Sequence, residues 1–211
     1  MGNNLIPPVK AAVFLAALVP LARLCWLGFS DGLGAHPVQF VTHSTGTWTL
    51  ALLLITLSIT PLRQLIGQSW PQQFRRMCGL FAFFYASLHF LCYVWLDQWF
   101  DWPAITKDIA KHPYVMVGFT AFMLLIPLAA TSTQAMMRRL KRRWQQLHRL
   151  VYVIASLGVL HFLWLVKKDF SEPLIYGGIL ALLLGFRLAP TTWLAEMLAR
   201  MLQAGKQEAA R

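Results

Sequence analysis

Charged side chains are scarce in this chain, which has 211 residues of which only 13% are charged. In soluble domains about a quarter of the residues are charged. The shortage is concentrated in long apolar stretches, and hydrophobic residues make up 57% of the chain. This pattern excludes an ordinary water-soluble domain and indicates that lipid is the solvent.

Acidic residues are rarer still, with 8 against 19 basic ones, which gives a net charge of +11. A strongly basic chain can indicate a nucleic-acid partner. Here, however, the basic residues gather at the ends of apolar segments and form no basic face on a soluble domain. Charges at segment ends are typical of the positive-inside bias of membrane proteins, so we expect contact with a lipid bilayer and no nucleic acid.

Cysteine is also infrequent, and the chain has three: Cys25, Cys78 and Cys92. They form neither a CxxC pair nor a CxxCH haem-attachment motif. A zinc site, an iron–sulfur cluster and a covalently attached c-type haem are therefore excluded as working hypotheses.

Six apolar segments are each near the roughly 20 residues needed to cross a hydrocarbon core. They cover residues 9–29, 44–62, 77–96, 114–131, 149–166 and 173–190. Their connections are short, and no internal repeat is evident. We expect an all-α integral membrane protein, a six-helix transmembrane bundle that occupies residues 1–211 as a single domain.

The loop charges predict the orientation of this bundle, because basic loops stay in the cytoplasm. One side carries Arg63, Arg75, Arg76, Arg138, Arg139, Lys141, Arg142 and Arg143. The other side carries Asp31, Asp97, Asp101, Asp108, Asp169 and Glu172. Both termini should therefore be cytoplasmic (N-in/C-in). Apolar residues recur at helical spacing over 191–203, so we expect a short amphipathic helix within a cytoplasmic tail at 191–211.

Two histidines lie within predicted spans, where an ionisable side chain is costly and indicates function. His89 follows Arg76 by 13 residues, and His161 follows Arg149 by 12. Both imidazoles then lie roughly 18–20 Å from the cytoplasmic edge, on two helices that run in the same direction. Two neutral imidazoles at one depth in apolar surroundings suit the axial ligands of a haem iron. We predict that His89 and His161 hold a b-type haem.

Small residues accompany both histidines. Gly79, Ala82 and Ala86 precede His89 at helical spacing, and Gly158 lies one turn before His161. Such a strip makes room for a flat porphyrin. The alternative is that small residues only permit close helix packing, as is common in membranes.

His148 and His43 allow two interpretations each. His148 lies roughly 20 Å below His161, where it suits a second haem nearer the cytoplasm, although no histidine faces it from the 77–96 segment. It is otherwise an interfacial residue of a basic loop. His43 could bind a quinone head group, orient a haem propionate or act as an alternative ligand, or it could simply cap a helix. His36 and His112 fall in outer loops, and we assign them no role.

The basic stretch from Arg138 to Arg143 is sufficiently explained by topology and by contact with anionic lipid. The phosphate of flavin mononucleotide (FMN) is a further candidate for this stretch or for Arg75 and Arg76.

Several stretches resemble the haem-binding membrane subunit of the periplasmic protein-methionine-sulfoxide reductase system, the MsrQ family. They are residues 42–46 (THSTG), 80–89 (LFAFFYASLH), 130–136 (ATSTQAM), 144–148 (WQQLH) and 161–164 (HFLW). The resemblance extends over almost the whole chain. It places the chain in the broader ferric-reductase-like transmembrane group.

The resemblance implies electron transfer across a bacterial inner membrane, from quinol or a cytoplasmic flavin reductase to a periplasmic molybdenum-cofactor enzyme that reduces methionine sulfoxide in proteins. It implies haem b bound by His89 and His161, with His148 a further candidate, and FMN at an unmapped site. Methionine sulfoxide reduction by this chain alone is not expected. Larger members of the group have a second histidine where Arg75 and Arg76 stand, which weakens the case for a second haem. The alternatives are a ferric-chelate reductase and a haem transporter or structural subunit.

Overall fold

The computed structural model describes residues 6–188, and every regular element in that range is a helix. Six helices in this range are long and apolar enough to cross a membrane, which confirms the predicted bundle. They are α1 (Ile6–Phe29), α2 (Pro37–Ile66), α3 (Gln72–Leu91, continued by a π-helical turn over Cys92–Asp97), α5 (Pro113–Ala130), α8 (Leu150–Leu165, preceded by α7, Arg142–His148) and α9 (Ser171–Leu188). The amphipathic helix predicted at 191–203 lies outside the described residues.

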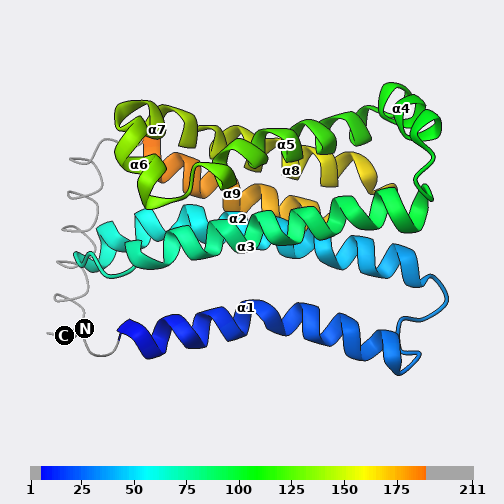
Figure 1. Ribbon diagram of the computed structural model, residues 1–211, viewed down its shortest axis with the longest axis horizontal. Helices are drawn as coiled ribbons and strands as arrows, with labels where there is room; N and C mark the ends of the chain where they lie inside the picture. The colour runs from blue at the N-terminus through cyan, green and yellow to red at the C-terminus, as the bar shows by residue number, and fades with distance from the viewer. Residues whose placement is uncertain (1–5, 189–211) are drawn as a thin grey trace, which may run out of the picture.

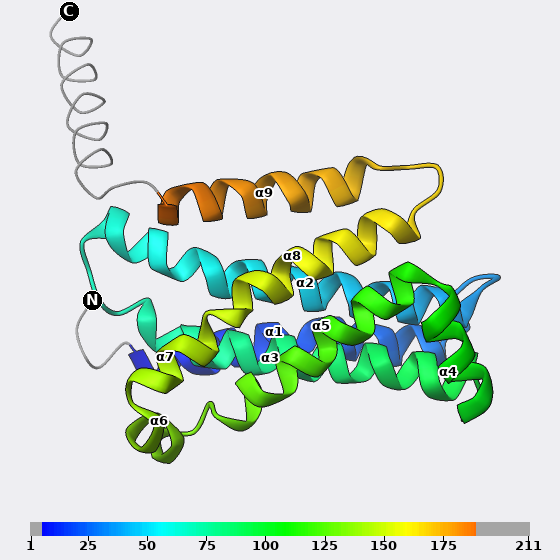
Figure 2. The same cartoon turned by 90° about the horizontal axis from the view of Figure 1, so that it is seen from above.

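The long helices run along one common axis, as Figures 1 and 2 show. α2 packs most extensively against α3, and α5 packs in the same way against α8. α9 covers α2 and α8, whereas α1 lies beside α3 at the edge of the bundle. Large apolar side chains on α1 and α9 face outward, among them Val19, Trp26 and Leu182. Lipid is the solvent that such exposed apolar surfaces require.

Some helices extend beyond the apolar segments because their end residues favour it. α2 begins with Pro37, whose fixed φ suits the first helical position, and its last residue, Ile66, is followed by Gly67 in the left-handed conformation. α3 gains extra length through its π-helical turn. The helix ends therefore depend on backbone conformation as well as on hydrophobicity.

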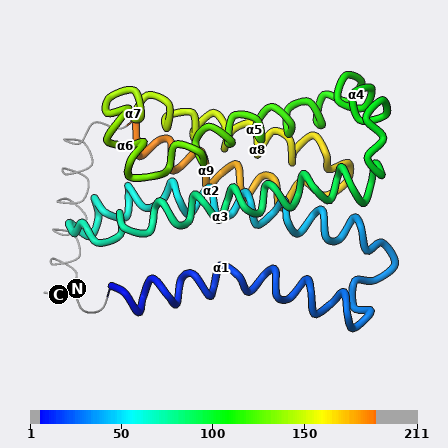
Figure 3. The backbone as a smooth tube through the Cα atoms, viewed as in Figure 1, coloured from blue at the N-terminus to red at the C-terminus, as the bar shows by residue number. Residues whose placement is uncertain are grey.

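Three short helices that the apolar pattern does not predict lie at the two ends of the bundle (Figure 3). α6 (Gln134–Leu140) and α7 lie at one end, which we call the arginine-rich end because it carries Arg63, Arg75, Arg76, Arg138, Arg139, Arg142 and Arg143. α4 (Trp102–Lys111) lies at the opposite end. Its Asp101 caps it by accepting a hydrogen bond from the Ala104 N–H at 3.0 Å.

A tyrosine from α3 joins α1 to the bundle beside Pro20, which lies inside that helix. Tyr85 is fully buried, and its hydroxyl donates to the Ala17 carbonyl at 2.7 Å. The same hydroxyl accepts from the Leu21 N–H at 3.2 Å. These are the two backbone groups that an uninterrupted helix would bond to each other, so the Tyr85 hydroxyl is inserted into the helical ladder.

We therefore expect Tyr85→Phe to destabilise the protein by about 1–3 kcal/mol, because two backbone groups in an apolar environment lose their partner. The measurements are the melting temperature in detergent and hydrogen exchange at the Leu21 amide. Tyr176→Phe on α9, which keeps its ring contact with Phe162, is the matched control. Equal melting temperatures for both variants would contradict the proposed bridge between α3 and α1.

Candidate functional site

His89 of α3 and His161 of α8 meet in the interior, with ring centroids 6.1 Å apart and ring planes at 80°. Each ring is fixed by one hydrogen bond from its Nδ1. His89 donates to the Thr42 carbonyl at 2.8 Å, and His161 donates to the Tyr114 carbonyl at 2.7 Å. A carbonyl only accepts, so Nδ1 carries the proton and Nε2 keeps a free lone pair in both rings. This is the tautomer and the outer hydrogen bond that a metal-ligating histidine needs.

The separation of the rings also suits one metal ion between them. An imidazole nitrogen binds a first-row transition metal at about 2.0–2.1 Å, and the ring centre lies about 1 Å behind it, so two rings on opposite sides of one ion are about 6 Å apart. The 6.1 Å between His89 and His161 agrees with that distance. No group of three or more histidine, cysteine or acidic side chains among residues 6–188 suggests an ordinary metal-ion site. The histidine pair instead suits a metal whose remaining ligands come from a macrocycle.

Two glycines make room for these rings. A Cβ atom at Gly118 of α5 would lie 2.7 Å from Nδ1 and 2.8 Å from Cε1 of His161. A Cβ atom at Gly46 of α2 would lie 3.0 Å from Cε1 and 3.1 Å from Nδ1 of His89. Each imidazole therefore rests directly on the backbone of the neighbouring helix, where any larger residue would displace it.

The two histidines are held by matching parts of the chain. In each case the histidine follows its carbonyl partner by 47 residues, and the glycine stands four residues after that partner. The hydropathy pattern shows no internal repeat, so Gly46, Gly118, Thr42 and Tyr114 were not predicted from the sequence. A comparison of the α2–α3 and α5–α8 segments offers the missing signal, because both place a glycine at the same distance before a His-Phe pair.

The histidine pair faces a cavity of about 1150 Å³ between α2, α3, α5 and α8. That volume slightly exceeds the range of about 300–1,000 Å³ that is usual for small-molecule sites, so the cavity has room for a large ligand. Its deeper wall is apolar and aromatic, from Leu50, Leu53, Phe90, Phe119, Phe122, Leu125 and Ile154. A large flat apolar group fits such walls.

One polar atom in the wall has no partner. The Thr42 hydroxyl is buried and makes no hydrogen bond within residues 6–188. An unsatisfied hydroxyl in an apolar interior costs about 1–3 kcal/mol. Thr42 lines the cavity beside His89, so a group with a hydrogen-bonding atom at this place would satisfy it.

The mouth of the cavity, at the end opposite the arginines, is polar. His43 lines it and meets Phe162 edge-on at 5.4 Å, and His36, to which we assigned no role from the sequence, lies there too. Lys167 and Lys168 supply positive charge, and Asp169 follows them. Hydrogen bonds from Ser171 to Asp169 hold the pKa of that carboxyl below its usual range. Asp97 and Asp108 line the cavity as well, so its polar lining combines two lysines with three carboxylates and can form hydrogen bonds to the polar edge of a bound group.

His148 lies away from this cavity, at the end of α7. Its Nε2 is 3.0 Å from the Thr131 hydroxyl, and its ring stacks on Trp144 with centroids 3.9 Å apart. The offset that relates His89 to His161 also relates Arg76 to His148, so the matching position on α3 is an arginine. A second haem at His148 stays a prediction.

The small residues near the histidines do not all have the same surroundings: some line the cavity, and others only allow close helix packing. Ala86 and Gly158 line the cavity. Gly79 instead lies against Thr56, where an added Cβ would meet the threonine methyl group at 3.7 Å, and Ala82 is fully buried. Gly79 and Ala82 thus serve the close packing of α3, whereas Ala86 and Gly158 border the open cavity.

These features define a class of protein: a six-helix membrane protein with a paired-histidine cavity between its helices. Comparison with known sequences agrees with that class. The model of the family described as ferric reductase like transmembrane component matches residues 45–159, which include parts of all four cavity helices.

Curated relatives narrow the family further. The chain is 56% identical over 183 residues to the protein-methionine-sulfoxide reductase heme-binding subunit MsrQ of Bordetella pertussis, a match that covers 86% of this chain and 89% of that one. It is 58% identical over 185 residues to the MsrQ of Xanthomonas campestris pv. campestris, with 85% of each chain covered. The MsrQ of Ralstonia nicotianae is 54% identical over 196 residues, which cover 89% of this chain and 90% of the relative. The chain therefore belongs to the MsrQ family, within the ferric-reductase-like transmembrane proteins.

Proposed function

We propose that this protein is a haem b electron-transfer subunit of the membrane, with the iron held between Nε2 of His89 and Nε2 of His161. The observation that carries this proposal is the pair of facing imidazoles, 6.1 Å apart, with both protons fixed on Nδ1. The heme-binding subunits named among its relatives support the choice of cofactor.

The bound haem would supply one-electron storage inside the membrane. The residues of the chain orient the ligands and shield the cofactor. The carbonyls of Thr42 and Tyr114 orient both rings and raise the basicity of the ligating nitrogens. Phe90, Phe119 and Phe122 exclude water from the deeper cavity. His43 at the mouth is placed to orient a haem propionate or to hold a quinone head group.

We further propose that the arginine-rich end faces the cytoplasm, as the positive-inside rule requires. The histidine pair then lies toward the outer face of a bacterial inner membrane. Electrons would enter from the quinol pool or from a cytoplasmic flavin reductase. If FMN takes part, the basic residues of α6 and α7 or Arg75 and Arg76 would hold its phosphate. The acceptor would be a periplasmic molybdenum-dependent protein-methionine-sulfoxide reductase, so this chain would not itself reduce methionine sulfoxide but would support the repair of oxidised proteins.

Spectroscopy of the purified protein tests this function. We expect a b-type absorption spectrum and one haem per chain, reduced by a quinol analogue or by a flavin reductase. Reoxidation should require the periplasmic molybdoenzyme together with an oxidised protein substrate. Purified protein without haem would overturn the proposal, as would reoxidation that the molybdoenzyme does not accelerate.

A second candidate follows from the matched family itself, whose description refers to ferric reductases. Such a protein would pass electrons from the same haem to external ferric chelates. Ferric citrate that reoxidises the protein as fast as the molybdoenzyme does would favour this alternative, and loss of haem during turnover would favour haem transport.

A further inference from the structure

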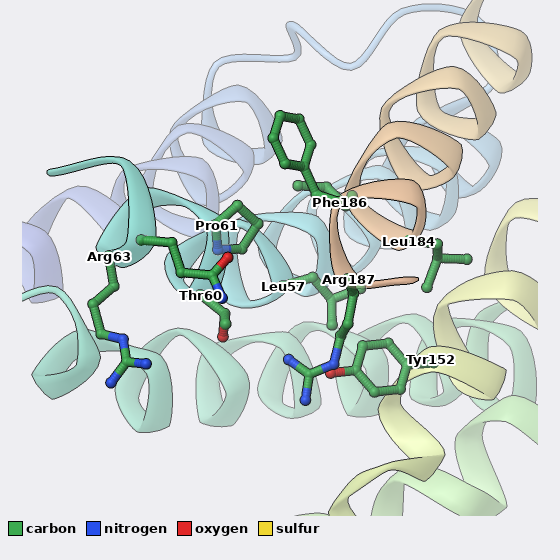
Figure 4. A pocket seen from close by; sticks show the side chains of 10 residues that line it. Leu57, Thr60, Pro61, Arg63, Tyr152, Leu184, Phe186 and Arg187 are labelled. Atoms are coloured by element: carbon green, nitrogen blue, oxygen red, sulfur yellow. The ribbon is translucent and has the colours of Figure 1, made fainter. Parts of the chain in front are cut away.

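A second cleft lies at the arginine-rich end, between α2, α8 and α9 and apart from the histidine cavity. Its volume is about 350 Å³. Its walls are Leu57, Thr60, Pro61, Arg63 and Gln64 of α2, Tyr152 of α8, and Leu183, Leu184, Phe186 and Arg187 of α9. Figure 4 shows that the side chains of Arg63 and Arg187 extend in the same direction from their two helices, with Thr60 between them.

The charge of this cleft is one-sided. Two guanidinium groups line it, and no carboxylate is among its lining residues. Within residues 6–188 the one ion pair is His112 with Asp108 at the opposite end of the bundle, so neither arginine pairs with an acid there. Two like charges that share a cleft repel each other, and an anion between them removes that cost.

Arg187 is also held in position. Its guanidinium carbon lies 5.0 Å from the centre of the Tyr152 ring, which is a cation–π contact. Tyr152 thereby restricts the long side chain, and the Arg187 guanidinium lies beside the Tyr152 ring in the cleft (Figure 4). Thr60 and Gln64 add neutral hydrogen-bond donors beside the two arginines.

The remaining walls are apolar, and the cleft opens where two membrane-spanning helices end. Below it, α9 exposes Ile179 and Leu182 to the lipid. We propose that the cleft binds the phosphate group of an anionic phospholipid of the facing leaflet. Arg63 and Arg187 bind the phosphate, and the acyl chains lie along the apolar surface of α9.

Neither the helix dipole nor a free phosphate ion accounts for the two arginines as well as a phospholipid does. Both residues stand near helix C-termini, where a positive charge is favourable by itself. That effect requires neither a shared cleft nor an aromatic support for Arg187. A free phosphate ion would use the same donors, but it would gain nothing from Leu183, Leu184 and Phe186.

The test measures phospholipid retained by the full-length protein in detergent, by native mass spectrometry. The probes are phosphatidylglycerol, diacylglycerol, which lacks phosphate, and inorganic phosphate as a competitor. The variants are Arg63→Gln, Arg187→Gln and the double substitution. Arg138→Gln removes the same charge from an exposed position on α6 that does not line the cleft, and it is the matched control.

We expect phosphatidylglycerol to bind the wild-type protein and diacylglycerol not to bind. Each substitution in the cleft should weaken phosphatidylglycerol binding about tenfold, the usual loss for a charge-assisted hydrogen bond. Arg138→Gln should have no effect, and inorganic phosphate should not displace the lipid. If Arg187→Gln fails to fold because its contact with Tyr152 is lost, Arg63→Gln alone decides.

Three results would overturn the proposal. Unchanged lipid binding in Arg63→Gln would exclude the cleft as the site. An equal loss in Arg138→Gln would mean that the lipid responds to the net charge of this end of the bundle. Displacement by inorganic phosphate at the concentration of the lipid would assign the cleft to free phosphate. The haem content serves as a separate readout, and we expect it to be unchanged in all four variants.

Discussion

Replacing either His89 or His161 by alanine is expected to abolish the b-type absorption of the purified protein. Each variant removes one of the two imidazole rings whose centroids lie 6.1 Å apart beside the cavity. Loss of an outer hydrogen-bond partner alone costs a metal site about 10–100-fold in affinity, and loss of a ligand costs more. We therefore expect almost no haem after purification, measured as the haem-to-protein ratio together with the optical spectrum.

Two other histidines are the controls for that experiment. His36→Ala removes an imidazole from the mouth of the cavity without touching the pair, and it should leave the spectrum unchanged. His148→Ala should spare the main haem and change at most a minor component, because His148 bonds to Thr131 outside the cavity. Complete loss of haem in His148→Ala would mean that the ligand pair is wrongly assigned, as would full haem content in both His89→Ala and His161→Ala.

Gly118→Ala, which adds one methyl group, is expected to have the second large effect on haem binding. The new Cβ would lie 2.7 Å from Nδ1 of His161, closer than Cβ atoms are found to approach other atoms, so either the ring or α5 must shift and the hydrogen bond to the Tyr114 carbonyl is strained. Overpacking of this kind costs about 1–3 kcal/mol. We expect haem retention to fall about tenfold or more at a cost of that size, and the remaining haem to have an altered electron paramagnetic resonance spectrum.

Alanine substitutions at two other glycines, Gly46 and Gly178, allow a comparison with Gly118→Ala. Gly46→Ala brings its Cβ to 3.0 Å from the His89 ring, so we expect the same change to be smaller. Gly178→Ala on α9 meets no atom within 4 Å and should keep the wild-type spectrum. It should also gain up to about 1 kcal/mol of stability, because alanine is the better helix former. A Gly118→Ala protein with the spectrum of Gly178→Ala would show that His161 is not constrained by α5.

The position of His161 illustrates why the spectrum is a better readout than activity. Its ring is held by a carbonyl on α5, by the backbone at Gly118 and by the facing ring of His89. If His161 binds the iron as proposed, a small displacement of its ring would change the ligand field before it removes the cofactor. The electron paramagnetic resonance signal therefore separates a displaced ligand from a chain that fails to fold, which activity does not.

Several features were predictable from the sequence because they depend on local chemistry. A chain in lipid must satisfy its backbone hydrogen bonds within each helix, so six apolar segments of about 20 residues predict six spanning helices. The rise per residue then predicts that His89 and His161 lie at one depth. The family resemblance rested on the order of short motifs, and the curated relatives confirm it.

The depth of a residue does not say toward which neighbour its side chain points, and that direction is known only from the packed helices. Rotation about the helix axis brings the rings of His89 and His161 together and leaves His148 against Trp144 and Thr131. The carbonyls that fix the ring protons are 47 residues away in sequence. Contacts of that kind depend on how α2 packs on α3 and α5 on α8, and hydrophobicity does not specify such packing.

The same division applies to the small residues and to the arginines. The sequence indicated that the small residues near the histidines and the basic residues at the helix ends have roles, and hydropathy placed them within or at the ends of the helices. Which glycine supports an imidazole ring, and which arginines share a cleft, depends on atoms brought within a few ångströms by several helices at once. Hydropathy was sufficient to predict the six spanning helices, and the helical rise predicted a common depth for the two histidines. Only the packed bundle decided which side chains meet, because steric contact depends on all the neighbouring helices together.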